Sequence, residues 1–201
     1  PTGIDLPGEK GALLPSQEWK RRVQKQPWFS GDTVSFGIGQ GFFLATPLQL
    51  AHATAVISQR GENFKPRVLY ATEHPGTRVK TVEAPRPLPP VTVKNPRFWD
   101  AVITGMIHVV EGGTAHKIGA GAKYRIAGKT GTAQVFTLGQ GEKYNAKHLA
   151  KHLLDHALFM AFAPVEDPRI AVAVIAEHGG GGSATAASLA RKVMDAWLLN
   201  K

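Results

Sequence analysis

Apolar residues recur at helical spacing in two stretches of the chain. Between Asn95 and Gly113 they fall on one face of a helix, with polar residues on the other faces. The apolar set of this predicted helix is Trp99, Val102, Ile103, Met106, Ile107 and Val110. A final helix is predicted from Ser183, with a broad apolar face that we expect to pack on a sheet. That face comprises Ala186, Leu189, Ala190, Val193, Met194, Trp197 and Leu198.

Strand patterns lie between these two helices. Residues 123–135 alternate in polarity around the segment Gly128-Lys129-Thr130-Gly131-Thr132. Two apolar runs, 155–164 and 169–178, are separated by turn residues and predict an antiparallel hairpin at the buried centre of a sheet. The predicted fold class is therefore α+β, an antiparallel sheet covered by helices. A length of 201 residues is enough for one such domain or part of one.

The first half of the chain is less regular. Residues 1–15 are dense in glycine and proline and predict an extended connector on the surface. Thr46-Pro47-Leu48-Gln49 combines a threonine cap, a proline at the first helical position and a glutamine at the third, which predicts a helix that ends at Gly61. Residues 66–70 are strand-like, and the five prolines of 75–90 predict a peripheral loop or hairpin edge.

Residues 31–43 alternate apolar with small side chains, a pattern typical of a strand, before three glycines that allow close backbone approach. The glycines do not form a dinucleotide-binding loop, because Phe42 occupies the place of the required third glycine. The large aromatic residues just before this stretch are expected to pin it to the core. They are Trp19, Trp28 and Phe29.

Composition excludes several classes of function. The chain has no cysteine, so neither disulfides nor thiolate chemistry is available to it, and it has no apolar run near the roughly 20 residues of a membrane span. The net charge of +9 is gathered partly at Lys20, Arg21, Arg22 and Lys25 and partly in residues 143–151. Neither cluster has aromatic residues interleaved at a spacing that would stack bases, which favours a solvated basic face over nucleic-acid binding. Such a face attracts acidic polymers.

The segment from Gly128 to Thr132 carries the most specific chemistry. Strand parity places Lys129 and Gly131 on one pleat face, so an ammonium stands beside bare backbone. This suits an acyl-transfer strand at a sheet edge, where a substrate adds as a further strand and the lysine attracts its carboxylate. The N–H of Thr132 is then a candidate oxyanion donor. The alternative at this point is an ordinary strand with a turn-forming Lys-Thr-Gly.

Two other patterns are judged not to be sites. His148, His152 and His156 would share one side of a helix, but Leu149 stands where a zinc protease needs a glutamate, and no carboxylate completes a ligand shell. The glycine run 179–182 is not followed by the Lys-Ser/Thr of a phosphate loop. We expect it to provide flexible clearance.

The residues that carry a family resemblance occur in order over nearly the whole chain. They are Thr2-Gly3-Ile4-Asp5-Leu6-Pro7-Gly8-Glu9, Ser35-Phe36-Gly37-Ile38-Gly39-Gln40-Gly41, Thr46-Pro47-Leu48-Gln49, Lys129-Thr130-Gly131-Thr132-Ala133-Gln134, Asp155-His156-Ala157 and Glu177-His178-Gly179-Gly180-Gly181-Gly182. Together they resemble the C-terminal part of the transpeptidase domain of class B penicillin-binding proteins, closest to the elongation-specific penicillin-binding protein 2 group.

The resemblance implies a penicillin-binding, serine β-lactamase-like fold and a D,D-transpeptidase that cross-links peptidoglycan through an acyl-serine intermediate. On the family pattern Lys129 and the hydroxyls of Thr130 and Thr132 hold the carboxylate of the substrate or of a β-lactam, beside Gly131. The N–H of Thr132 supplies half of the oxyanion hole. Strict strand parity turns Thr130 away from Lys129 unless the edge strand twists. No cofactor and no metal is implied.

The resemblance also implies partners and a place in the cell. Peptidoglycan stem peptides and β-lactam antibiotics are the expected ligands. A membrane glycan polymerase and scaffold proteins of the elongation complex are the expected protein partners, and nucleic acid is not. The expected location is the periplasmic face of the bacterial inner membrane, with an anchor outside this chain.

The family's Ser-x-x-Lys and Ser-x-Asn motifs do not occur in the chain. Ser16 has its lysine one residue too far, and Ser188 has Arg191 where a lysine is needed. Because the family places both motifs before the segment at residues 2–9, we expect residues 1–201 to be the C-terminal part of one transpeptidase domain, inactive alone. Residues 137–154 are expected to be an insertion loop within it.

Two other functions fit the same residues. One is a hydrolase of the same superfamily, either a D,D-carboxypeptidase or a β-lactamase. The other is a non-catalytic wall-binding or drug-sensing domain that keeps a Lys-Thr-Gly cleft without the serine. Sequence upstream of Pro1 distinguishes these possibilities from the transpeptidase.

Overall fold

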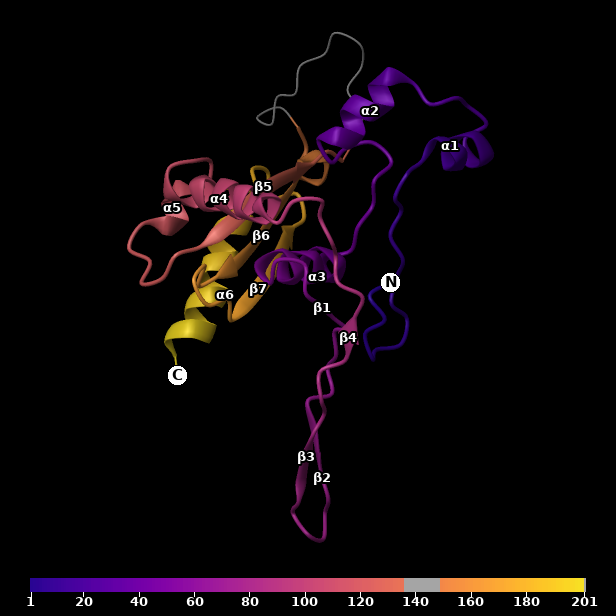
Figure 1. The fold of residues 1–201 in the computed structure, drawn as a ribbon. Coiled ribbons are helices and arrows are strands. Elements are labelled where there is room, and N and C mark those ends of the chain that lie inside the picture. Colours follow the sequence, from indigo (N-terminus) through magenta and orange to yellow (C-terminus); the bar gives the residue numbers. More distant parts are fainter. Residues whose placement is uncertain (136–148, 201) are drawn as a thin grey trace.

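A three-stranded antiparallel sheet lies at the centre of the structure, a computed structural model that describes residues 1–135 and 149–200. Its strands, in order across the sheet, are β5 (Ala127–Ala133), β6 (His156–Ala163) and β7 (Ile170–Ala176) (Figure 1). The predicted hairpin of the two apolar runs is confirmed, because β7 pairs along its whole length with residues 157–163 of β6. Among the described strands, however, β7 is an edge of the sheet, and only β6 is central.

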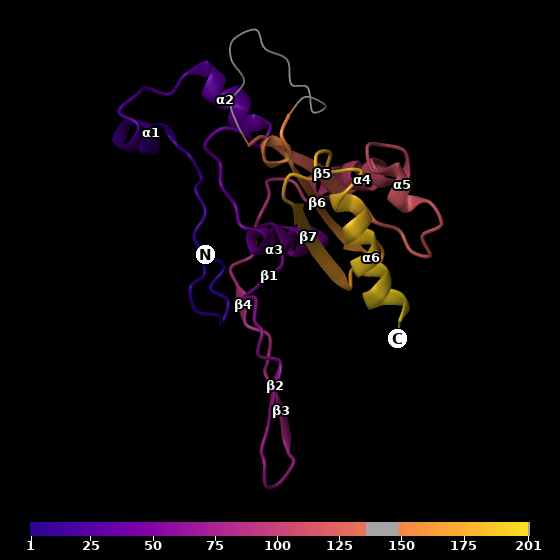
Figure 2. The same cartoon turned by 180° about the vertical axis from the view of Figure 1, so that it is seen from behind.

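Helices cover both faces of this sheet, as Figures 1 and 2 show from opposite sides. Helix α4 (Arg97–Glu111) packs on β5, and α3 (Pro47–Ser58) packs on β7 and β6. Helix α6 (Ala186–Leu199) packs on β6 and β7 from the other side. The short helix α5 (His116–Gly119) follows α4, and a 3₁₀ helix, η2 (Lys151–Leu153), precedes β6. The predicted α+β class is confirmed.

The two helices with predicted apolar faces bury only part of each face. In α4 the buried residues are Ile103, Met106, Ile107 and Val110. In α6 they are Ala186, Ala187, Ala190 and Met194. The alanines let α6 lie close to the sheet, so the contact follows the line of small residues. The larger residues expected on the same face are about half exposed to solvent: Leu189 is 44%, Val193 50% and Trp197 53% exposed.

The start of α3 is built as its sequence predicts. The Thr46 hydroxyl accepts a hydrogen bond from the Gln49 backbone N–H at 3.2 Å, and the Gln49 side chain accepts one from the Thr46 N–H at 2.8 Å. Thr46 is therefore a helix cap. The chain leaves the helix through Gly61, whose φ is +99°. A Cβ at Gly61 would lie 2.2 Å from the carbonyl oxygen of Val91, so only glycine fits.

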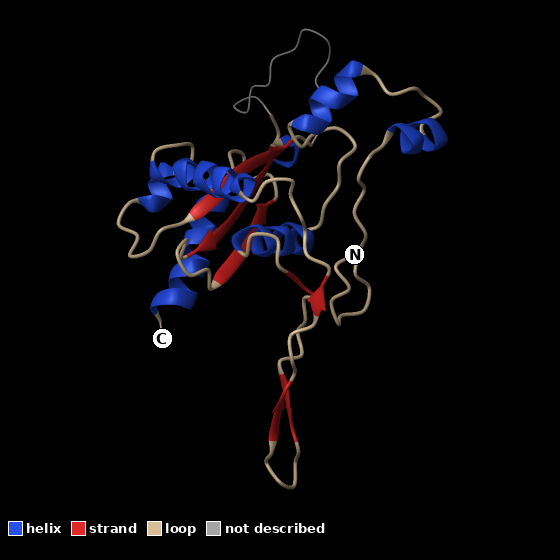
Figure 3. Cartoon of the chain, viewed as in Figure 1, coloured by secondary structure: helices blue, strands red, loops and turns tan. Residues whose placement is uncertain are grey.

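The proline-rich segment forms a two-stranded ribbon that projects from the body (Figures 1 and 3). Its strand pairs are β1 (Asn63–Phe64) with β4 (Pro87–Leu88) and β2 (Ala71–Glu73) with β3 (Lys80–Val82). The prediction of a hairpin edge is confirmed, but the strand expected over residues 66–70 is wrong. The N–H groups of Val68 and Leu69 donate to the Asp5 carboxylate at 2.6 and 3.0 Å, so a side chain takes the bonds that a strand partner would.

The N-terminal arm carries two short helices, α1 (Gln17–Val23) and α2 (Ser30–Gly37), outside the helical layers that cover the sheet; α2 ends near one end of β5, and α1 lies farther out (Figure 1). The strand pattern read in residues 31–43 is therefore wrong. The reason is local, because the Asp32 carboxylate accepts the Phe29 N–H at 2.7 Å and closes the first turn of α2. The same carboxylate forms an ion pair with Lys20.

That ion pair also corrects the picture of a solvated basic cluster. Lys20 is 3% exposed, and its ammonium lies 4.5 Å from the centre of the Phe29 ring. Arg21, Arg22 and Lys25 remain exposed as predicted. The second basic cluster, at residues 143–151, lies largely outside the described residues.

The aromatic residues of the arm do not pin it to the core as expected. Trp19 packs against Phe42 with ring centres 5.3 Å apart, and the Trp28 indole donates to the Thr33 hydroxyl at 2.8 Å. Phe29 is 54% exposed. These contacts are internal to the arm, and the two buried clusters of the described residues include none of the three aromatics.

Across residues 1–135 and 149–200, none of the helices combines the length and the apolarity that a membrane span requires.

Replacing Asp32 with asparagine is expected to loosen α2 in a pH-dependent way. The hydrogen bond from Lys20 and then the Phe29 N–H hold the pKa of Asp32 below its usual value. Its contribution to stability is therefore present above the unfolded pKa of about 3.9 and is lost as the pH falls through the folded pKa. At pH 7 the amides of α2 should exchange with solvent faster in D32N than in the wild type. The difference should vanish at strongly acidic pH.

The matched control is Asp100→Asn, which removes an exposed ion pair with Arg60 elsewhere in the chain. This variant should leave exchange in α2 unchanged. Equal exchange in D32N and wild type at pH 7 would show that the ion pair does not hold the helix.

Candidate active site

The Lys129 side chain extends from an edge strand of the sheet. Lys129 is exposed, and its ammonium donates to the backbone carbonyl of Thr130 at 2.8 Å. In the register of the sheet Lys129 pairs with Met160, and Gly131 pairs with Leu158. These two residues therefore lie on one pleat face, as parity predicts. The ammonium stands beside a position without a side chain.

Two backbone carbonyls identify the open edge of β5. The carbonyl of Thr130 accepts from Lys129, and the carbonyl of Thr132 accepts from the Gln40 side chain at 2.7 Å. Residues two apart in a strand point their backbone polar groups to the same side, and the N–H and C=O of one residue point together. Because these carbonyls bond to side chains, they face away from β6. The N–H of Thr132 therefore faces the same open edge, where it is available to an oxyanion.

Thr130 is separated from the other predicted site residues. Its register partner Phe159 is buried in the cluster beneath α6, on the opposite face from Lys129. The Thr130 hydroxyl lies 3.3 Å from the hydroxyl of Thr114, in the turn that follows α4. The strand thus keeps strict parity, and its twist does not bring this hydroxyl to the ammonium. Lys129, Gly131 and the backbone N–H of Thr132 are brought together at the edge, whereas the Thr132 side chain shares the pleat face of Thr130, because its register partner Ala157 lies in the same cluster as Phe159.

The glycine run at 179–182 packs closely against the motif strand, which corrects the prediction of flexible clearance. Gly182 is buried, and a Cβ on it would lie 2.4 Å from the carbonyl oxygens of both Gly131 and Leu158. Gly181, one residue earlier, has no atom within 4 Å of such a Cβ. The loop therefore supports β5 from the α6 side. A glycine run alone does not signal this contact, because the partner is about fifty residues away in the sequence.

Gln40 is the second residue that the sequence did not identify as part of the site. It belongs to a glycine loop considered and rejected as a nucleotide site, and its partner on β5 is 92 residues away. Only a long-range contact reveals it.

The histidines do not form the aligned set considered above. His148 lies outside the described residues, and residues 151–156 form a 3₁₀ turn and the start of β6 instead of a continuous helix. His156 accepts the backbone N–H of His178 at 3.0 Å, and their rings meet edge to face at 4.8 Å. In the part of the chain that the structure describes, no three histidine, cysteine or acidic side chains are grouped to hold a metal.

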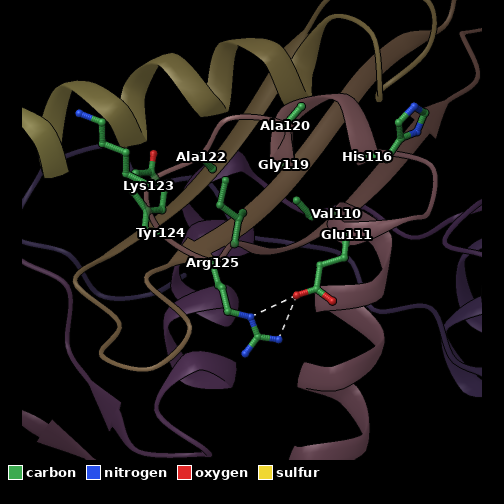
Figure 4. A pocket seen from close by; sticks show the side chains of 10 residues that line it. Val110, Glu111, His116, Gly119, Ala120, Ala122, Lys123, Tyr124 and Arg125 are labelled. Carbon is green, nitrogen blue, oxygen red and sulfur yellow. Dashed lines mark hydrogen bonds and ion pairs between the residues drawn. The ribbon is translucent and has the colours of Figure 1, made fainter.

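A cavity of about 630 Å³ lies between the end of α4, α5 and the entry to β5 (Figure 4). Its lining includes Glu111, Tyr124 and Arg125, but not Lys129 or Thr132. Arg125 is already paired with Glu111 at 3.0 Å, and the Tyr124 hydroxyl donates to Asp195 at 2.7 Å. Burial and the Asp195 carboxylate raise the pKa of Tyr124. These groups satisfy one another, so the open edge of β5 remains the candidate site.

The sequence of the chain is similar to that of known proteins. The family model described as the penicillin binding protein transpeptidase domain matches residues 1–195. The peptidoglycan D,D-transpeptidase MrdA of Haemophilus influenzae is 47% identical over 200 residues, which are 98% of this chain and 30% of that protein. The chain therefore spans about a third of the length of this curated relative.

Solved structures agree with the sequence match. Pseudomonas aeruginosa PBP2 in complex with WCK 5153 aligns with a TM-score of 0.78 and 44% identity, over 97% of this chain and 40% of that chain. Helicobacter pylori PBP2, solved as a complex with MreC, aligns with a TM-score of 0.77 and 32% identity, over 98% of this chain and 33% of that chain.

Replacing Gly182 with alanine is expected to disturb the motif strand. The added Cβ would collide with the carbonyls of Gly131 and Leu158, which are backbone atoms and cannot rotate away. We expect the thermal midpoint of the protein to fall and the amides of β5 to exchange faster. Gly181→Ala is the control, since its Cβ enters open space. Equal effects of the two substitutions would mean that the loop does not support β5.

Proposed function

The chain belongs to the penicillin-binding protein transpeptidase domain family, and on that premise we propose that the protein carrying it is a peptidoglycan D,D-transpeptidase. One observation indicates which residues of this chain take part in the reaction. The Lys-Thr-Gly-Thr segment forms an edge strand whose lysine is exposed and whose Thr132 backbone groups face away from the neighbouring strand. A peptide substrate that adds to this edge meets a cation and a free backbone donor together.

The proposed reaction proceeds in two steps. The hydroxyl oxygen of a serine, supplied by a part of the protein outside this chain, attacks the carbonyl carbon between the last two D-alanines of a stem peptide. The carbon–nitrogen bond breaks, and D-alanine leaves with the serine proton on its amine. An amine of a second stem peptide then attacks the acyl-serine ester, forms the cross-link and returns a proton to the serine.

Lys129 is proposed to hold the substrate's terminal carboxylate. Its ammonium is exposed on the edge strand, and Gly131 on the same face leaves room for a ligand beside it. The ammonium is bonded to the Thr130 carbonyl and would exchange that neutral acceptor for a carboxylate. A charge-assisted hydrogen bond is stronger than a neutral one, so the exchange favours ligand binding.

The N–H of Thr132 is proposed to be one donor of the oxyanion hole. Its removal from such a site typically costs about 3 kcal/mol of transition-state stabilisation. The hydroxyl of Thr132 is exposed on the pleat face opposite Lys129, the face of Thr130, and is proposed to reach the carboxylate from that side. The hydroxyl of Thr130 joins them only by exchanging its 3.3 Å contact with Thr114 for the ligand.

The partners, inhibitors and cellular location of the protein are proposed from those of its relatives. Because a Helicobacter pylori homologue forms a complex with MreC, we propose that the protein works with scaffold proteins of an elongation complex. A membrane glycan polymerase is proposed as a further partner, β-lactams as inhibitors and the periplasmic face of the inner membrane as the location. Residues 1–201 are proposed to be the C-terminal part of the transpeptidase domain, with residues 137–154 as an insertion.

Lys129→Ala in the full-length protein is expected to slow acylation by a fluorescent penicillin. Loss of a hydrogen bond between charged groups costs about 1.5–3 kcal/mol, which corresponds to a fall of about 10- to 100-fold in the second-order rate constant. Lys123→Ala is the matched control, because it removes another exposed lysine just before the same strand. Equal rates for the two variants would contradict the proposed role of Lys129.

A further inference from the structure

Gln40 joins the N-terminal arm to the open edge of β5. Its side-chain amide donates to the Thr132 carbonyl at 2.7 Å, a contact between residues 92 positions apart in the sequence. The loop that carries it follows α2 directly, because the Gln40 N–H bonds to the Ser35 carbonyl at 2.9 Å. Gly39 and Gly41 on either side have φ of +76° and +74°. Two glycines in the left-handed region therefore set the direction in which the residue between them points.

The contact occupies an acceptor that a ligand needs. A peptide that adds to the open edge of β5 as a strand donates its backbone N–H groups to the carbonyls that face that edge. Those carbonyls belong to Thr130 and Thr132, and each already accepts from a side chain of this chain, Lys129 or Gln40. The Gln40 amide N–H has the chemistry of a peptide N–H. It stands where the N–H of the ligand would stand.

We propose that Gln40 is a specificity-determining residue of the site, a stand-in donor that a ligand displaces with an amide N–H of its own. The proposal rests on the proposed function. Its ligands are peptides ending in acyl-D-alanyl-D-alanine and β-lactams that carry an acylamino group, since both offer an N–H next to the reacting carbonyl. A ligand without that N–H leaves Gln40 in place.

This exchange makes a prediction about selectivity that a merely structural contact does not make. In the wild type the Thr132 carbonyl is bonded whether or not the ligand brings a donor. Without the Gln40 amide, a ligand that lacks the N–H covers the carbonyl and leaves it unsatisfied, whereas a ligand with the N–H forms a new bond. Loss of the amide should therefore increase the preference for ligands with an acylamino group.

The test compares two probes in the full-length protein. Benzylpenicillin carries the acylamino N–H, and penicillanic acid has the same ring system and carboxylate without it. The measured quantity is the ratio of their second-order acylation rate constants, obtained by competition with a fluorescent penicillin. In Gln40→Ala the ratio of benzylpenicillin to penicillanic acid should rise about 5- to 100-fold, as expected for one covered acceptor left without a donor.

A second variant guards against a collapse of the loop. Gln40→Met keeps the length of the side chain but has no N–H, and it should raise the ratio in the same way. Gln17→Met, on the exposed surface of α1, should leave the ratio unchanged. A ratio that stays the same or falls in both Gln40 variants overturns the proposal, even if both individual rates decrease. If neither probe acylates the wild-type protein, the proposed function itself fails.

Discussion

The antiparallel pairing of β5 with β6 is the constraint on which the rest of the structure depends. It places Gly128 against the buried ring of Phe159, where a Cβ would lie 2.5 Å from the ring, so the strand seats in the core only because that side chain is missing. The same pairing uses the backbone groups on one edge of β5. The carbonyls on its other edge accept hydrogen bonds from side chains. Lys129 and Thr132 are therefore fixed by the core and exposed at the same time, which is what a preorganised site requires.

Two distant segments complete this edge without belonging to the sheet. The loop at Gly182 presses on the carbonyls of Gly131 and Leu158 from the side of α6, and Gln40 reaches the Thr132 carbonyl from the N-terminal arm. Neither segment contributes a charge. The Gly182 loop packs against the strand and limits its movement. Gln40 satisfies the Thr132 carbonyl, which would otherwise be hydrogen-bonded to water before a ligand binds. The chemistry of the edge is thus carried by few residues, and its geometry is set by many.

Local patterns predicted those elements whose cause is local. The capping box at Thr46, the apolar stripe of α4 and the parity of Lys129 and Gly131 all follow from neighbours within a turn or a strand. The strand expected over residues 31–43 failed for a local reason, the Asp32 cap of α2, but the other errors arose where a distant partner decided the outcome. Asp5 took the amides of a predicted strand, and Lys20 was buried by its ion pair with Asp32. Gln40 and Gly182 could not be assigned to the site, since one sequence holds no record of contacts across the fold.

The most direct measurement of the central claim is a crystal structure of the full-length protein acylated by benzylpenicillin. The open edge of β5 should then carry the drug as an added strand, with the acyl carbonyl oxygen accepting from the Thr132 N–H and the carboxylate against the Lys129 ammonium. An adduct whose carbonyl meets no donor from β5, with Lys129 still bonded to the Thr130 carbonyl, would contradict the account.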